Sequence, residues 1–144
     1  MNSVIIETLR STPSPRQLAQ SIESLRQFDE RELFDTLFFL SVRKQGDGLP
    51  VAYAAVALEE LNPKCLINLR QALEAILPEW DISIEEVVFY LMRQFGMKAM
   101  RSTQLEIQAS SNLASIEEKR LNTVMYWAKI WVEEHQTDQS AKTI

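Results

Sequence analysis

The chain has 144 residues, of which 46% are hydrophobic and 24% are charged, and its formal net charge is −5. These proportions are typical of one globular domain and exclude an intrinsically disordered chain. The acidic balance argues against nucleic acid as a partner, because binding to a phosphate backbone depends on concentrated lysine and arginine. We expect one α-helical domain over residues 1–135 and a polar, frayed tail over 136–144.

The start of the chain and its cysteine content indicate an intracellular protein. Residues 1–15 lack the basic start, apolar run and small-residue cleavage site of a secretory signal. The longest apolar stretches, such as 51–58, are far shorter than the ~20 residues that cross a bilayer. The lone Cys65 has no second cysteine with which to form a disulfide within the chain. These features favour a soluble cytoplasmic protein that does not enter a membrane.

The first two predicted helices begin at proline and at aspartate. Ser14 can cap a helix whose first residue is Pro15, and leucine and isoleucine then recur at helical spacing as far as Phe28. Asp29 and Glu32 form a capping-box pattern in front of a second apolar run. We expect these two helices to pack as an antiparallel pair.

A glycine-containing loop over 44–50 precedes the third predicted helix, which runs to about Leu61. Gly46 and Gly48 can take positive φ, and the following positions are mostly alanine and valine. Because a helix that is apolar on nearly every side must be covered on nearly every side, we expect this helix at the centre of the fold.

Asn62 and Pro63 repeat the pattern of a cap followed by proline, and they predict the start of a fourth helix that ends at Pro78. Cys65 falls inside this apolar helical pattern. It is therefore expected to be a buried free thiol.

Ser83 and Glu86 form a capping box for a fifth helix, which Gly96 is placed to end. Residues 101–114 are ambiguous, because their apolar residues alternate as in a strand and also fit a helix. No second convincing strand is available to pair with this segment. We favour helix or irregular structure there.

The last predicted helix begins at a capping box formed by Ser115 and Glu118 and ends near Glu134. One of its faces is continuously apolar, and Tyr126 and Ile130 lie on the opposite side. Either a second helix of this chain or the ambiguous 101–114 segment covers that side, or it is a surface for a partner, where aromatic residues are enriched.

Similar apolar segments start at positions 15, 50 and 85, a spacing of 35 residues. This length is typical of the helix pairs in α-solenoids, although any run of helices joined by short loops can show such spacings. The predicted fold is all-α, with five to seven helices in antiparallel pairs that form a helical bundle or a short HEAT-like α-solenoid.

The stock of residues for catalysis is small, since the chain has one histidine and one cysteine. His135 follows two glutamates at the end of the last helix, where an imidazolium interacts favourably with exposed carbonyls. We predict no catalytic residue, no cofactor and no metal site. A basic group formed by Arg93, Lys98 and Arg101 could contact an anion or an acidic partner, although cations near a helix end are also expected for dipole reasons.

These patterns favour a non-enzymatic protein–protein interaction module, such as an adaptor, an inhibitor, an assembly factor or an immunity-type protein. The expected partner is a protein, with a second copy of the chain as the simplest case. The alternative is a small enzyme or ligand-binding regulator with a pocket between helices, using Tyr53, Tyr90 and a carboxylate as its polar groups.

Overall fold

The computed structural model describes the backbone of residues 1–143 and the side chains of residues 1–136. Within this range the chain forms eight α-helices, two short 3-10 helices and no β-strand, which confirms the all-α prediction with a slightly higher helix count. The elements are α1 (Ser3–Arg10), η1 (Pro15–Gln17), α2 (Leu18–Ser24), η2 (Leu25–Gln27), α3 (Glu30–Ser41), α4 (Val51–Leu61), α5 (Leu69–Ile76), α6 (Glu86–Phe95), α7 (Met97–Ser110) and α8 (Ser115–Thr143).

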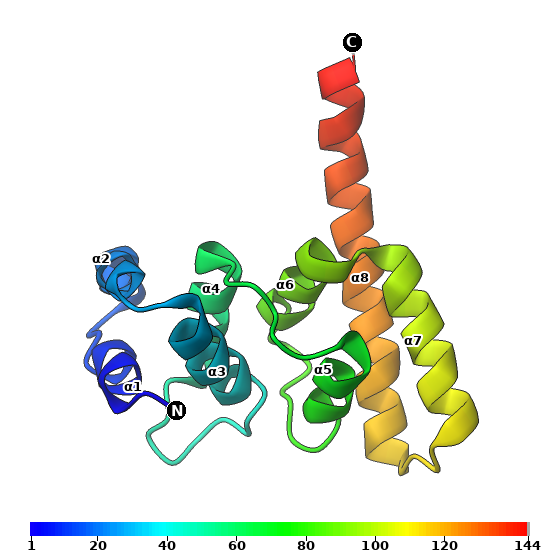
Figure 1. The fold of residues 1–144 in the computed structure, drawn as a ribbon, viewed down its shortest axis with the longest axis horizontal. Helices are drawn as coiled ribbons and strands as arrows, with labels where there is room; N and C mark the ends of the chain where they lie inside the picture. The colour runs from blue at the N-terminus through cyan, green and yellow to red at the C-terminus, as the bar shows by residue number, and fades with distance from the viewer. Residues whose placement is uncertain (144) are drawn as a thin grey trace.

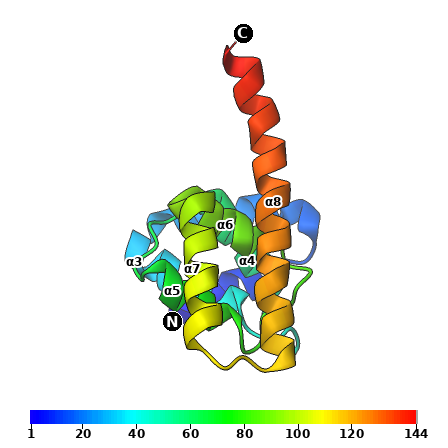
Figure 2. The same ribbon diagram turned by 90° about the vertical axis from the view of Figure 1, so that its right-hand side faces the viewer.

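The helices are stacked side by side, from α1 and α2 at one end to α7 and α8 at the other (Figure 1). Helices α2, α4, α6 and α8 form a row in which each contacts the next, and α1, α3, α5 and α7 lie alongside that row. The loop over 111–114 joins α7 to α8, which run antiparallel, and the C-terminal part of α8 projects beyond the body (Figure 2). Among the described residues, no helix is both long and apolar enough to span a membrane.

One hydrophobic core runs through this stack from Ile5 in α1 to Ala128 in α8. Helix α4 lies at its centre, in contact with α2, α3 and α6. Its alanines Ala54, Ala55 and Ala57 are completely buried. Small side chains allow neighbouring helices to approach closely, so the expected central position of this helix is confirmed.

Several local predictions are also confirmed. Asp29 caps α3 by accepting a hydrogen bond from the amide of Glu32 at 2.8 Å. Gly96 ends α6 with a φ of 85°, a conformation that favours glycine. Most of the ambiguous 101–114 segment belongs to α7, so it is helical, as we favoured.

The predicted start of the fourth helix at Pro63 is wrong. Asn62 takes a left-handed conformation with a φ of 48° and ends α4, and the hydroxyl of Tyr90 donates to the carbonyl of Pro63 at 2.7 Å. Helix α5 begins only after Asn68, which forms a capping box with Gln71. Cys65 therefore lies in the connection between two helices and is half-buried.

Both of the other predicted capping boxes are replaced by different contacts. The hydroxyl of Ser83 donates to Asp81 at 2.7 Å, and α6 begins without a side-chain cap. At the start of α8, the carboxylate of Glu117 accepts a hydrogen bond from the amide of Ala114 at 3.0 Å. This contact lies one residue before the predicted pair, Ser115 and Glu118. Helix α8 does not end near Glu134, because no glycine or proline interrupts it before Thr143. Of the predicted tail, Ile144 and the side chains from residue 137 onward lie outside the described residues.

The first helix and its packing differ from the prediction. The sequence pattern missed α1, which Asn2 caps by accepting from the amides of Val4 and Ile5. A hydrogen bond of 2.6 Å between the hydroxyls of Thr12 and Ser21 links the segment after α1 to α2. Helix α2 packs on α1 and α4, whereas α3 packs most extensively on α4, so the expected pairing of the 15–28 and 30–40 helices is not the main one.

Candidate interaction surface on the last helix

The inner face of α8 is part of the core. Leu121, Val124 and Ala128 are completely buried. Residues at spacings of three and four lie on one side of a helix, so these three form a continuous apolar line against α6 and α7. This half of the helix is committed to the fold.

Polar contacts anchor one flank of α8 to the loop over 77–85. The guanidinium of Arg120 donates to the carbonyls of Leu77 and Pro78, both at 2.9 Å, and to the carbonyl of Trp80 at 3.0 Å. The indole of Trp127 donates to the carbonyl of Ile82 at 2.8 Å. The loop carbonyls, which no helix or sheet satisfies, thereby obtain donors from α8.

The outer face of α8 carries a second line of residues, again at spacings of three and four. Ile116 and Tyr126 on this line are 51% and 56% exposed, and Ile130 is half-buried. Lys119 and Thr123 lie between them. We call these five residues the α8 stripe.

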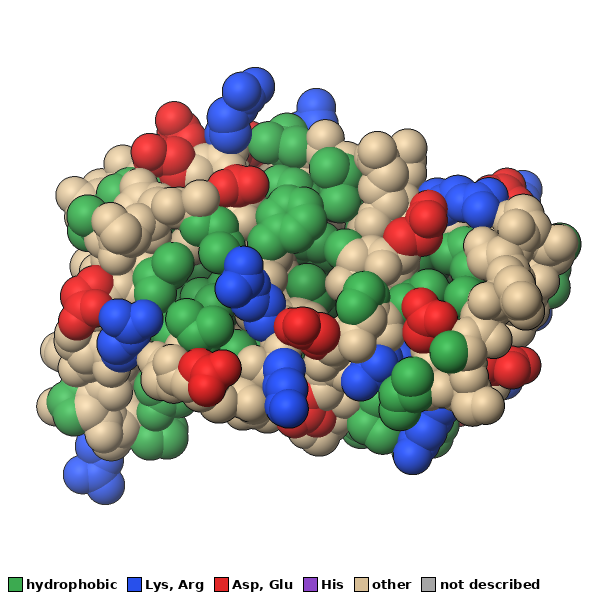
Figure 3. All heavy atoms as spheres, turned by 90° about the horizontal axis from the view of Figure 1, so that it is seen from below, with side chains coloured by type: hydrophobic (Ala, Val, Ile, Leu, Met, Phe, Trp, Pro, Cys, Tyr) green, Lys and Arg blue, Asp and Glu red, His purple; other side chains and the backbone are tan. Residues whose placement is uncertain are grey.

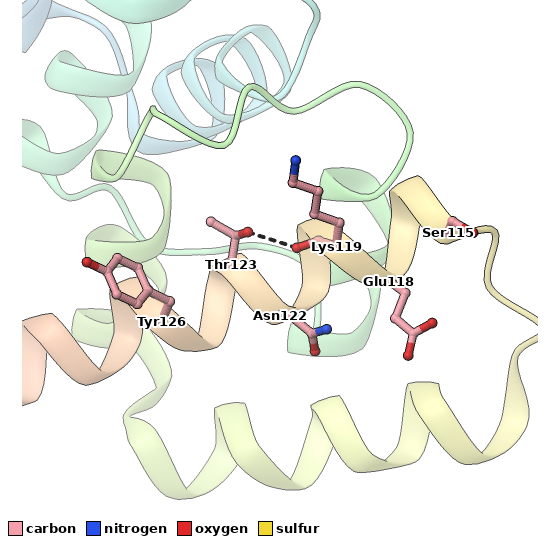
Figure 4. Close-up of a pocket in the computed structure, with 6 residues that line it drawn as sticks. All are labelled: Ser115, Glu118, Lys119, Asn122, Thr123 and Tyr126. Atoms are coloured by element: carbon pink, nitrogen blue, oxygen red, sulfur yellow. Dashed lines mark hydrogen bonds between the residues drawn. The ribbon is translucent and has the colours of Figure 1, made fainter.

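The surface around the stripe is shallow. A depression of about 460 Å³ is lined by Ser115, Glu118, Lys119, Asn122, Thr123 and Tyr126, all of which belong to α8 (Figure 4). In Figure 4, Lys119 and Thr123 point to one side of the helix, while Glu118 and Asn122 point toward α7. The hydroxyl of Thr123 donates to the carbonyl of Lys119 at 2.8 Å. Since a single helix lines this depression, it suits a neighbouring helix better than an enclosed small molecule.

A groove of about 510 Å³ between α7 and α8 adjoins the stripe. Its apolar walls include Leu105, which is 58% exposed, and Tyr126. Its charged lining residues are both cations, Arg101 and Lys129. The remaining lining residues are Gln104, Asn122 and Met125.

The three basic residues predicted to act together lie on two successive helices, with Arg93 on α6 and Lys98 and Arg101 three residues apart on α7. Arg101 lines the α7–α8 groove, whereas the guanidinium of Arg93 donates to the carbonyl of Glu59 on α4 at 3.4 Å. Burial raises the pKa of the Glu59 carboxyl, and the nearby Arg93 opposes that rise. Lys98 is exposed at the start of α7. Of the three, Arg101 is the one that lines the same groove as Tyr126.

The groups considered for a pocket enzyme are engaged in the fold or dispersed. Tyr90 is completely buried, and its hydroxyl donates a hydrogen bond to the main-chain carbonyl of Pro63. Burial raises the pKa of that hydroxyl far above its usual value. Tyr53 is half-buried against the core. Burial raises the pKa of the Cys65 thiol, which disfavours the reactive thiolate. The ring of His135 stacks on Trp131 with centroids 3.9 Å apart.

A third concave region lies beside α3, and the sequence pattern did not point to it. It has a volume of about 670 Å³, and its apolar lining comes from Met1, Phe34, Phe39, Leu66 and Ile67. The rings of Phe34 and Phe39 meet edge to face, with centroids 6.0 Å apart. We call it the α3 groove. Figure 3 shows hydrophobic side chains gathered in the middle of the lower face of the molecule, with charged side chains around them.

Comparison with models of known protein families, with curated proteins and with solved structures finds no match. The function proposed below therefore depends on the geometry of this chain alone. Of the described residues, no group of three or more histidine, cysteine, aspartate or glutamate side chains is arranged to hold a metal ion.

Proposed function

We propose that this chain is a non-enzymatic protein–protein interaction module that binds its partner through the α8 stripe. The observation that carries the proposal is the exposure of Ile116 and Tyr126, each more than half accessible, on a helix whose opposite face is core. Large exposed apolar side chains gathered on one face mark interaction sites, and tyrosine is a frequent anchor of protein interfaces.

The placement of the reactive groups favours binding over catalysis. His135 lies on α8, whereas Cys65 lies in the connection between α4 and α5. The buried hydroxyl of Tyr90 is occupied by a main-chain carbonyl. A nucleophile and a base must come within hydrogen-bond reach to act together, and the histidine and the cysteine lie on separate elements of the fold. Tyr90 lies beside Cys65, but burial raises the pKa of both groups, which disfavours their reactive forms.

The stacked helices suit an adaptor, an inhibitor, an assembly factor or an immunity-type protein. Positions 15, 50 and 85 fall at the starts of η1, α4 and α6, and α2, α4 and α6 are successive members of one row. This coincidence supports the short α-solenoid interpretation, in which repeated helix pairs present an extended binding surface. The single half-buried thiol suits a reducing compartment such as the cytoplasm.

A capture experiment with a matched control tests the module. The parent chain, Tyr126→Glu and Val4→Glu are immobilised and exposed to an extract of the source cells, and each captured protein is then purified for a binding isotherm. Val4 is 57% exposed on α1, so it matches Tyr126 in exposure at the other end of the stack. We expect Tyr126→Glu to weaken binding by about tenfold or more and Val4→Glu to leave it unchanged. Equal binding by all three chains would contradict the proposal.

The alternative function is that of a ligand-binding regulator, and the α3 groove is the place where the ligand would bind. Its volume of about 670 Å³ falls in the usual range for small-molecule pockets, and aromatic rings line it. Leu66 is 45% exposed at its edge, so Leu66→Asp changes the groove with little cost to the core. A small apolar compound that raises the melting temperature of the parent chain but not that of Leu66→Asp would favour this alternative.

A further inference from the structure

The two isoleucines of the α8 stripe are placed symmetrically about its middle residue, whereas Lys119 and Tyr126 differ in type and lie four and three residues from it. Ile116 lies seven residues before Thr123, and Ile130 lies seven residues after it. Reversing the direction of the helix therefore exchanges the two isoleucines and leaves the threonine in place. A surface of this kind is suited to a copy of itself, because a two-fold axis brings one patch against the same patch on the second chain.

The stack of helices ends at this face. In the row formed by α2, α4, α6 and α8, the helices α4 and α6 each have a row neighbour on both sides, whereas the main neighbours of α8 are α6 and α7. A further helix on the outer face of α8 would continue the row. The α8 of a second copy provides such a helix without requiring any new element.

We infer that α8 of a second copy covers the α8 stripe, packed antiparallel about a two-fold axis near Thr123; this inference depends on the proposed function. The antiparallel arrangement places Ile116 of one copy beside Tyr126 and Ile130 of the other. It also brings Lys119 of each copy near Tyr126 of its partner, a pairing in which an ammonium group can lie against an aromatic ring. Each of these contacts occurs twice.

A parallel pair of α8 helices is disfavoured by the same residues. It would set Lys119 against Lys119 and align the two helix dipoles, and both effects are repulsive. In the antiparallel pair the two copies of Lys119 are separated, and the two helix dipoles point in opposite directions, which is favourable. The sequence of the stripe thus selects the direction of pairing as well as the partner.

The flank of the stripe that faces α7 adds charge complementarity. Glu118 lies five residues before Thr123, and Lys129 lies six residues after it. Glu118 points toward α7, and Lys129 lines the α7–α8 groove, so both belong to this flank. Antiparallel pairing then sets Glu118 of one copy opposite Lys129 of the other, at two symmetric positions. These exposed pairs weaken with salt.

The size of the contact predicts a weak dimer. From Ile116 to Ile130 the stripe is about 21 Å long, whereas a stable interface buries roughly 800 Å² on each partner. Leu105 on one side, and Ile82 with Glu79 in the loop beside Ile116 on the other, can widen the contact. We therefore expect an association that depends strongly on concentration.

Sedimentation of the full chain tests whether it self-associates. Between about 1 and 500 μM, the mass should rise from the 16.6 kDa of one chain toward twice that value. Tyr126→Ala should weaken the dimer by about tenfold or more, and the exposure-matched Val4→Ala should have no effect. A parent chain that stays monomeric throughout this range overturns the inference, whatever the variants do.

Disulfide trapping tests the direction of the pair. In a Cys65→Ala background, Thr123→Cys should cross-link to itself on oxidation, because two copies of this residue flank the axis. Ile116→Cys and Ile130→Cys should each cross-link weakly alone and strongly when the two chains are mixed. If each cysteine variant cross-links to itself and the mixture gives no cross-link between the two variants, the pairing is parallel. If the chain dimerises without any of these cross-links, the contact lies elsewhere. Either result overturns the antiparallel assignment.

The outcomes separate this inference from the proposed function. If the chain is monomeric and a foreign protein binds the parent but not Tyr126→Glu, the self-pairing fails and the interaction module stands. If neither a second copy nor another protein depends on Tyr126, both fail.

Discussion

The two faces of α8 have similar apolar patterns and different roles. Leu121, Val124 and Ala128 on one face and Ile116, Tyr126 and Ile130 on the other all recur at helical spacing. Only the first set is buried in the core. A flank between the two faces carries Arg120 and Trp127, which donate to the carbonyls of the 77–85 loop. Burial in the core distinguishes the inner face, and the hydrogen bonds of the adjoining flank to the main chain hold the helix in that orientation.

The largest difference between the faces should appear when a core leucine is truncated. Leu121→Ala removes buried methyl groups at a fully enclosed position, and such changes cost about 2–5 kcal/mol in the free energy of unfolding. Ile116→Ala, on the exposed face of the same helix, is the matched control and should cost much less. Urea denaturation of dilute samples measures both, and equal losses would show that the outer face also belongs to the core.

The next largest effect should come from Arg120. Its guanidinium supplies three hydrogen bonds to loop carbonyls, and hydrogen bonds from charged groups contribute about 1.5–3 kcal/mol. We expect Arg120→Ala to lower the free energy of unfolding by about 2–3 kcal/mol and Arg120→Lys to recover part of that loss, because lysine keeps the charge but not the planar fork. Hydrogen exchange over 77–85 should increase in the alanine variant; an unchanged exchange pattern would argue against this anchoring role.

Helix ends that depend on capping residues close in the sequence were predictable, whereas those that depend on contacts with distant residues were not. Asp29 and Gly96 act through neighbouring backbone groups, so they end or begin helices as expected. At Asn62 and Pro63 the same local pattern failed. The hydroxyl of Tyr90, 27 residues away, holds the Pro63 carbonyl in an irregular segment, and no local pattern contains that contact.

The candidate surface was predictable in part. The helical projection placed Tyr126 and Ile130 away from the apolar face, and Tyr126 is indeed exposed. The sequence pattern did not single out Ile116, although its distance of ten residues from Tyr126 continues the same stripe. The α3 groove could not be anticipated, since Phe39 and Leu66 come together only through the packing of α3 against the segment before α5.

A smaller effect should follow from Asp81 in the anchored loop. The amide and hydroxyl of Ser83 both donate to its carboxylate, at 2.9 and 2.7 Å, and they lower the pKa of that carboxyl. A carboxyl whose pKa is lower in the folded state contributes stability above its unfolded pKa, and this contribution disappears as the pH falls through the folded pKa. Asp81→Asn should therefore lower the melting temperature slightly at neutral pH, and the difference should shrink below about pH 4. A constant difference at all pH values would exclude this electrostatic origin.

The smallest effect on folding should come from the outer face itself. Tyr126 is 56% exposed, and its ring meets that of the neighbouring Trp127 with centroids 5.0 Å apart. Substitutions at exposed positions usually change the free energy of unfolding by no more than about 0.5 kcal/mol. In dilute solution, Tyr126→Ala should match the parent chain in helicity and in denaturation midpoint. At high concentration the two should diverge, because a dimer stabilises the folded state by mass action and only the parent retains it. A melting temperature that rises with concentration in the parent and stays constant in Tyr126→Ala would assign the outer face to association. A variant that is already less stable when dilute would instead assign Tyr126 to the fold, and the contrast between the two faces would be lost.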